Sequence, residues 1–162
     1  MRSSACFSHS TALLGTNMST AALLTPAVVL VLWTLVMLVW MAATRLPAMQ
    51  AMGADLAKAP PGGRGQDLEG RIDPKITWKA HNHTHLHEQP TLFYAIVAVL
   101  AFVGATSSLV VGLAWLYVGL RIAHSIWQAT VNVVKVRFAL FMAASIVLVI
   151  LAVLALIACL SV

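Results

Sequence analysis

Apolar residues form long unbroken runs in this sequence, and polar residues gather in the segments between them. A helix rises about 1.5 Å per residue, so about 20 apolar residues cross a hydrocarbon core of roughly 30 Å. Backbone groups in lipid must bond within their own segment, and the runs lack the alternation of barrel strands, so we expect helices. The pattern predicts an all-α integral membrane four-helix bundle over residues 21–162, with spans at about 21–43, 90–105, 109–128 and 138–160.

The polar segments predict the rest of the organisation. Residues 1–20 are rich in serine and threonine, and we interpret them as a disordered or spurious N-terminal extension, with Met18 as the expected true start. Arg45 and Pro47 are expected to close the first helix. The one long hydrophilic stretch, about 44–80, contains a Pro-Pro-Gly-Gly run that breaks helices, so we expect a solvated loop.

The basic residues predict the orientation of the chain. Most of them fall in the 44–80 loop, and Lys135 and Arg137 lie between the third and fourth spans. With four spans these two segments share one side of the membrane, leaving Arg2 on the other. The positive-inside rule then places the charged loops in the cytoplasm and both termini outside.

Composition excludes several classes of protein. Of 162 residues, 60% are hydrophobic and 9% charged, whereas a soluble domain has about 25% charged residues. The net charge is +5, but the basic residues lie between apolar spans rather than on a soluble face. We therefore expect lipids and lipophilic small molecules as partners, and no nucleic acid. Two cysteines, Cys6 and Cys159, are too few for a disulfide framework or a zinc site.

Histidines alternate through residues 81–88, just before the second span. If that helix begins before Pro90, steps of about 100° per residue place His81, His85 and Glu88 on one face. The other two histidines of the run then point away. Imidazoles bind zinc, copper or nickel, so a metal-handling function is one interpretation. Because no cysteine or second carboxylate lies nearby, we assign no metal ligands.

The third span carries its own polar stripe. A charged side chain in a membrane is costly, so Arg121 should point into the bundle, and Glu88 is the expected partner. Such a pair could lock two helices or border a polar pocket, and both interpretations stay open. With Arg137 and the histidines, these groups suit an anionic ligand that carries an amine, because guanidinium groups bind carboxylates bidentately. The stripe comprises Tyr117, Arg121, His124, Ser125, Gln128 and Asn132.

Three segments make the sequence similar to a known family: HLHEQPTLFY at 85–94, AWLYVGLRIAHS at 114–125 and QATVNVVKVRFALF at 128–141. They resemble the MAPEG proteins (membrane-associated proteins in eicosanoid and glutathione metabolism), over about residues 32–151. The loop segments RLPAM, GGRG and WKAHN are similar to an uncharacterised bacterial branch, which implies a bacterial inner membrane. The resemblance implies homotrimers that bind glutathione between neighbouring subunits near the cytoplasmic side.

The resemblance also implies roles for individual residues. Glu88 matches the family's second-helix glutamate, Arg121 the arginine that contacts glutathione, and Arg137 the arginine proposed to stabilise the thiolate. Ser125 falls at a small-hydroxyl position of the same pocket. His81 and His85 stand where the family has an arginine and an asparagine, and Gln128 replaces a frequent tyrosine. We expect Arg137 to be catalytic, and the glutathione-binding residues to be His81, His85, Glu88, Arg121, Ser125 and Gln128.

Three functions remain open on this basis. The first is a membrane-embedded glutathione-dependent transferase or peroxidase acting on lipophilic electrophiles, in which a guanidinium beside the thiol lowers its pKa and creates the nucleophile. The second is a non-catalytic membrane scaffold or lipid-binding protein, which the replaced asparagine and tyrosine favour. The third is a His-rich metal-handling protein, although the chain lacks the repeats of secondary transporters.

Overall fold

A computed structural model of the chain describes residues 18–53 and 61–161, and all regular elements within these ranges are helices. The predicted extension at 1–20 lies almost wholly outside the described residues. The helices are α1 (Thr20–Ala51), η2 (Gly65–Leu68, a 3₁₀ turn), α2 (Pro74–His85), α3 (Gln89–Phe102), α4 (Ser108–Thr130) and α5 (Val134–Leu160). The all-α prediction is confirmed.

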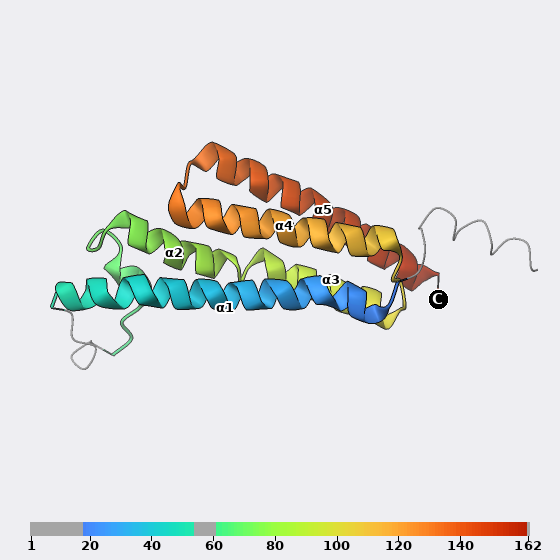
Figure 1. Ribbon diagram of the computed structural model, residues 1–162, viewed down its shortest axis with the longest axis horizontal. Coiled ribbons are helices and arrows are strands. Elements are labelled where there is room, and N and C mark those ends of the chain that lie inside the picture. Colours follow the sequence, from blue (N-terminus) through green and yellow to red (C-terminus); the bar gives the residue numbers. More distant parts are fainter. Residues whose placement is uncertain (1–17, 54–60, 162) are drawn as a thin grey trace, which may run out of the picture.

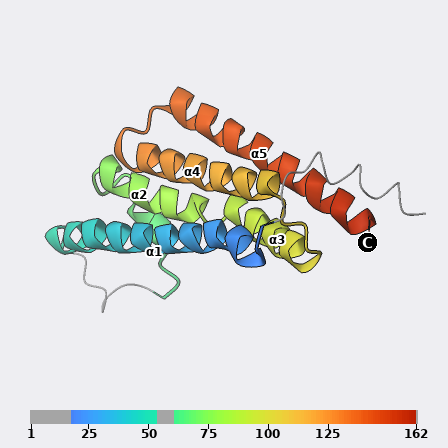
Figure 2. The ribbon, with the colours of Figure 1, turned by 45° about the vertical axis from the view of Figure 1, so that its right-hand side comes forward.

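The helices form an elongated bundle in which α2 and α3 follow one another along α1 (Figures 1 and 2). Helix α1 packs against α2, α3 and α4, and α4 packs along α5. At one end, the Met18 N–H donates to the Thr106 carbonyl at 2.8 Å, and the Thr106 hydroxyl donates back to Met18 at 2.7 Å. The other end holds α2 and the α4–α5 turn (Figure 1). The charged segments therefore meet at one end of the bundle.

Helix α1 is apolar on all sides, but only one stripe of it is buried. The hydroxyl of Ser19 caps its first turn by accepting from the Ala22 N–H at 3.2 Å. The buried stripe recurs every three or four residues, which is the spacing of one helical face. The opposite face exposes large apolar side chains, as expected for contact with lipid. The stripe consists of Leu23, Pro26, Leu30, Thr34 and Met37.

Within the part of the chain that the structure describes, three helices, α1, α4 and α5, are long and apolar enough to cross a membrane. Helix α3, which occupies the predicted second span, has 14 residues and is about 21 Å long. It ends at Phe102, before the predicted boundary at 105, because Gly104 adopts a left-handed φ of 72° that closes the turn. The second span is therefore shorter than the sequence pattern predicts.

The prediction that Arg45 and Pro47 end the first helix is wrong, since α1 continues to Ala51. A proline in a helix removes one backbone hydrogen bond, and here the neighbouring turns keep the helix intact. The guanidinium of Arg45 donates to the Gly65 carbonyl, which ties this extension of α1 to the loop. The 44–80 stretch is thus helical at both of its ends, because α2 begins inside it at Pro74.

The second predicted helix is broken at 86–88, so the assumption of a continuous helix through Glu88 is wrong. Pro90 lacks an N–H and its ring clashes with the carbonyl four residues earlier, at Leu86, which favours a break there. Glu88 takes φ −86° and ψ −90°, outside the helical region. His81 and His85 keep their shared face on α2, while Glu88 lies in the junction between the two helices.

Asn132 was predicted on the face of a continuous third helix, but it lies in the α4–α5 turn. Helix α4 ends at Thr130, and Asn132 has a φ of 56°, a left-handed conformation that asparagine tolerates. Its Oδ1 accepts from Arg137 Nη1 at 2.7 Å. The indole N–H of Trp127 closes the turn by donating to the Val133 carbonyl at 3.2 Å. The turn therefore fixes the position of Arg137.

Candidate functional site

The polar stripe of α4 points into the bundle. This direction was predicted, because a charged side chain such as Arg121 is costly to place in lipid. Asn132 apart, all its members are buried, and Arg121 and Ser125 have no exposed surface. A polar face this well buried needs partners, because unpaired polar groups in an apolar environment are costly. The buried members are Tyr117, Arg121, His124, Ser125 and Gln128.

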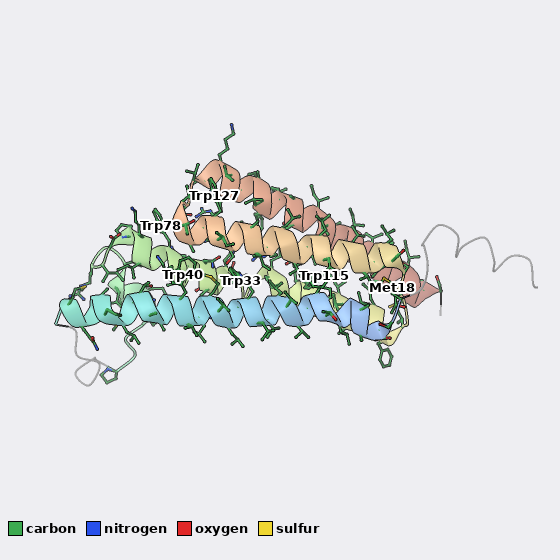
Figure 3. All side chains as sticks on the ribbon, viewed as in Figure 1. Met18, Trp33, Trp40, Trp78, Trp115 and Trp127 are labelled. Carbon is green, nitrogen blue, oxygen red and sulfur yellow. The ribbon has the colours of Figure 1, made fainter. Side chains whose placement is uncertain are left out.

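Ser125 joins three helices through one hydroxyl. Its Oγ accepts from Asn82 Nδ2 of α2 at 2.7 Å and from Trp33 Nε1 of α1 at 3.0 Å. Figure 3 labels Trp33 on the side of α1 that faces α4. The Asn82 side chain is 1% exposed, and its Oδ1 has no partner among the described residues. Ser125 is therefore a structural junction close to the site.

The contacts of Arg121 differ from the predicted pair with Glu88. Its Nη2 donates to the His85 carbonyl at 2.9 Å, and its Nη1 donates to Gln89 Oε1 at 3.4 Å. The break after His85 frees that carbonyl from the helical ladder, so a guanidinium replaces the missing N–H. Glu88 lies in the junction, and its Oε2 instead contacts His85 Nδ1 at 2.6 Å.

A cavity of about 590 Å³ lies at the charged end, between α1, α2, α4, α5 and the loop. Two arginines and two histidines share its wall with two glutamates, so the cavity offers groups that bind both signs of charge. Gln128 also lines it, and its buried Oε1 has no hydrogen-bond donor among the described residues. The ionisable residues in the lining are Arg45, Glu69, His81, His85, Glu88 and Arg137.

The loop forms one wall of this cavity and is fixed to α1 and α2. His81 Nε2 lies 2.7 Å from Glu69 Oε1, next to the tie between Arg45 and Gly65. His83 does not line the cavity, and its ring packs 4.6 Å from that of His87. Burial, together with His87, lowers the pKa of His83, so this imidazole is neutral at neutral pH. The wall is thus assembled from segments far apart in the sequence.

The structure groups five of the seven predicted site residues around this cavity: His81, His85, Glu88, Gln128 and Arg137. The other two, Arg121 and Ser125, are buried beside it, outside its lining.

Sequence reasoning missed Arg45, Glu69 and Asn82. The first two come from a stretch that we interpreted as a solvated loop. The third has a signal in the sequence, since it lies four residues before the apolar Leu86, on the same side of the helix, and both are buried.

The metal-handling interpretation gains no support from the geometry. Across residues 18–53 and 61–161, no group of three or more histidine, cysteine or acidic side chains is placed to hold a metal ion. The alternating histidines do not form one group, because the rings of His83 and His87 pack against each other at a tilt of 54° while His81 and His85 each contact a glutamate.

Replacing Ser125 with alanine is expected to lower the free energy of unfolding by about 2 kcal/mol, because the buried Asn82 Nδ2 and the partly buried Trp33 Nε1 lose their acceptor. The measurement is thermal or denaturant unfolding of the protein purified in mild detergent. Thr130→Ala is the matched control, because that hydroxyl is exposed and, among the described residues, bonds only to the Ile126 carbonyl. Its loss should change the free energy of unfolding by less than about 0.5 kcal/mol. Equal effects of the two variants would contradict the junction.

Comparison with known proteins gives one match. The model of the MAPEG family matches residues 23–157, most of the chain. No curated protein and no solved structure matches the sequence.

Proposed function

Because the chain belongs to the MAPEG family, we propose that this integral membrane protein is a glutathione-dependent transferase or peroxidase acting on lipophilic electrophiles. One observation carries the proposal beyond family membership. The 590 Å³ cavity combines basic and acidic side chains with a buried amide oxygen, which accepts no hydrogen bond from the described residues, at the charged end of the bundle. This volume is within the range of about 300–1,000 Å³ that is typical of small-molecule sites.

The lining suits the chemistry of glutathione, which carries a carboxylate at each end, an ammonium group and a thiol. Arg45 and the two imidazoles are donors for carboxylates, since a guanidinium binds a carboxylate bidentately. Glu69 and Glu88 are acceptors for the ammonium. The Gln128 Oε1 needs a donor, and an N–H of the ligand would relieve the cost of leaving it unpaired.

Arg137 is the residue that we assign to the thiol. Its guanidinium is held by Asn132 at the start of α5, where the polar cavity meets an apolar helix. A fixed positive charge near the thiol favours the thiolate, which is the nucleophile. The thiol proton would leave to water, and the thiolate sulfur would form a bond to the electrophilic atom of a substrate that arrives from the lipid side. The bond from that atom to its leaving group, such as the alkoxide of a peroxide, would break, and the leaving group would take the electron pair.

We also propose that the protein is a homotrimer, with the charged end in the cytoplasm of a bacterium and both termini outside. Gly112 and Gly119 lie seven residues apart and exposed on α4, with no atom near enough to contact an added Cβ. Small residues of this kind allow close helix packing in membranes. The charged loops would then face the side from which glutathione is supplied.

Calorimetry of the purified protein with glutathione tests the proposal. We expect binding in the micromolar to millimolar range, and about tenfold weaker binding by Gln128→Leu, because the ligand N–H loses its acceptor. Gln50→Leu is the matched control, since Gln50 is exposed and outside the cavity. Absence of binding at millimolar glutathione would contradict the proposal. If the purified protein carried lipid and did not bind glutathione, the result would favour the non-catalytic scaffold.

A further inference from the structure

His85 and Glu88 form a hydrogen-bonded pair at the break between α2 and α3. His85 Nδ1 lies 2.6 Å from Glu88 Oε2. An ionised carboxylate can only accept a hydrogen bond, so Nδ1 carries the hydrogen, and in the neutral imidazole Nε2 is then the basic nitrogen. Nε2 of His85 makes no hydrogen bond to another of the described residues. The pair therefore presents one oriented base that has no partner within the described part of the chain.

The imidazole of His85 is held in place on several sides. The rings of His124 and Phe141 lie 5.2 and 5.5 Å from it, between ring centres. The backbone carbonyl of His85 accepts from Arg121 Nη2 at 2.9 Å, which fixes the residue at the end of α2. Its side chain is 25% exposed, so water still reaches it. A general base needs a fixed position and a route for its proton, and His85 has both.

His85 also lies beside the residue that we assign to the thiol. A smaller cavity of about 200 Å³ adjoins the larger one of 590 Å³, and His85 and Arg137 are the two described residues that line both. Because the imidazole and the guanidinium share both linings, they border the same region at the charged end. A sulfur placed against Arg137 is therefore close to the imidazole of His85.

The charges around His85 favour a proton on its ring once an anion is bound. In the free protein, the carboxylate of Glu88 favours the imidazolium, and the guanidinium of Arg137 opposes it. A thiolate beside the ring adds a second negative charge, so the balance moves toward the imidazolium. The charged and titratable groups around the residue are Glu88 of the junction, His81 of α2, Arg121 and His124 of α4, and Arg137 of α5.

We propose that His85 is the base that takes the thiol proton of bound glutathione, with Glu88 as its positioning residue. The inference rests on the proposed function and adds a catalytic residue to the same site. The S–H bond breaks, its electron pair stays on the sulfur, and an N–H bond forms at Nε2. Once the sulfur has bonded to the electrophile, the imidazolium loses its anionic neighbour and releases the proton to water.

This role narrows what His85 does for the ligand. Its Nδ1 is used by Glu88 and its Nε2 meets the sulfur, so the donors for the carboxylates of glutathione are Arg45 and His81.

Counting the protons released when glutathione binds tests the role of His85. Calorimetry near neutral pH, in two buffers with different heats of ionisation, gives that number, and ultraviolet absorbance gives the thiolate formed. S-methylglutathione has no thiol proton and supplies the baseline. We expect fewer than about 0.5 protons released per thiolate in wild type, because His85 keeps the proton. We expect about one in His85→Asn, because an amide has no basic nitrogen.

Two further variants complete the test. Glu88→Gln removes the negative charge that stabilises the imidazolium, so its ratio of protons to thiolate should move toward one. The Glu88 side chain is 61% exposed, so this variant should fold. His83→Asn is the matched control, since it makes the same substitution in a histidine outside both cavities, and it should keep the wild-type ratio.

The possible outcomes separate this inference from the proposed function. About one proton per thiolate in wild type, or equal ratios in wild type and His85→Asn, would overturn the role of His85 and leave the glutathione site standing. An unchanged ratio in Glu88→Gln would remove Glu88 as the positioning residue. Absence of binding in wild type would contradict the proposed function and this inference together. Binding without a thiolate signal would contradict the roles of both Arg137 and His85.

Discussion

Replacing Arg137 with leucine is expected to reduce the turnover of glutathione with a soluble nitroaromatic electrophile about 10- to 30-fold at pH 7. An opposite charge within about 4–6 Å lowers a pKa by 1–3 units, and a thiol whose pKa is near 8.5 is only about 3% thiolate at pH 7, so its thiolate fraction can rise at most about 30-fold. Arg137 lines the cavity and is fixed by Asn132, so its charge is already oriented in the free protein. The loss should be in kcat, with a much smaller change in glutathione affinity.

The measurements are the ultraviolet absorbance of the thiolate on adding glutathione, its pH dependence, and steady-state turnover. The thiolate signal in Arg137→Leu should move to higher pH, because the pKa of the bound thiol returns toward its usual value near 8.5. Arg137→Lys keeps a positive charge and should retain part of the activity. Lys135→Leu is the control for loss of a nearby charge. An unchanged thiolate titration in Arg137→Leu would remove Arg137 from the catalytic role.

Replacing Arg121 with leucine is expected to lower the free energy of unfolding by about 3 kcal/mol, the largest stability effect that we predict. The side chain has no exposed surface, and the His85 carbonyl and Gln89 Oε1 would lose their charged donor. Hydrogen bonds to charged groups contribute about 1.5–3 kcal/mol, and leaving a buried partner unsatisfied adds to the loss. Unfolding in mild detergent measures the change.

The same variant separates two roles for Arg121. The family resemblance implies a contact with glutathione, whereas the structure places Arg121 outside the lining of the larger cavity. If Arg121 only holds the α2–α3 junction, the folded fraction of Arg121→Leu should bind glutathione within a fewfold of wild type. A large loss of affinity with unchanged stability would indicate direct contact instead. Arg71→Leu, an exposed arginine of the loop, is the matched control and should change stability by less than about 0.5 kcal/mol.

The inward direction of the α4 stripe could be predicted from the sequence because it depends on a local rule. Polar side chains recur on one face of a helix, and a charge such as Arg121 is too costly to face lipid. The partner of Arg121 could not be predicted in the same way. That partner is a backbone carbonyl, at His85, and it is available only because the helix breaks before Pro90.

The composition of the larger cavity depends on longer-range geometry. Glu69 meets His81 across a turn of loop, and Arg45 meets Gly65 because α1 extends beyond the proline that was expected to end it. Neither of these two contacts can be predicted from the periodicity of apolar and polar residues. Asn82 was overlooked for a different reason: the histidines around it dominate the pattern, yet the asparagine occupies the buried face.

The short helix α3 has a consequence for the choice of membrane. At about 21 Å it is shorter than a hydrocarbon core of roughly 30 Å, whereas α1, with 32 residues, exceeds it. Such hydrophobic mismatch is accommodated by local thinning of the bilayer, at a fraction of a kcal/mol per Å. A thicker bilayer would draw the polar junction at His85 and Gln89 into hydrocarbon, so acyl-chain length in the host membrane becomes a determinant of how stable the folded protein is.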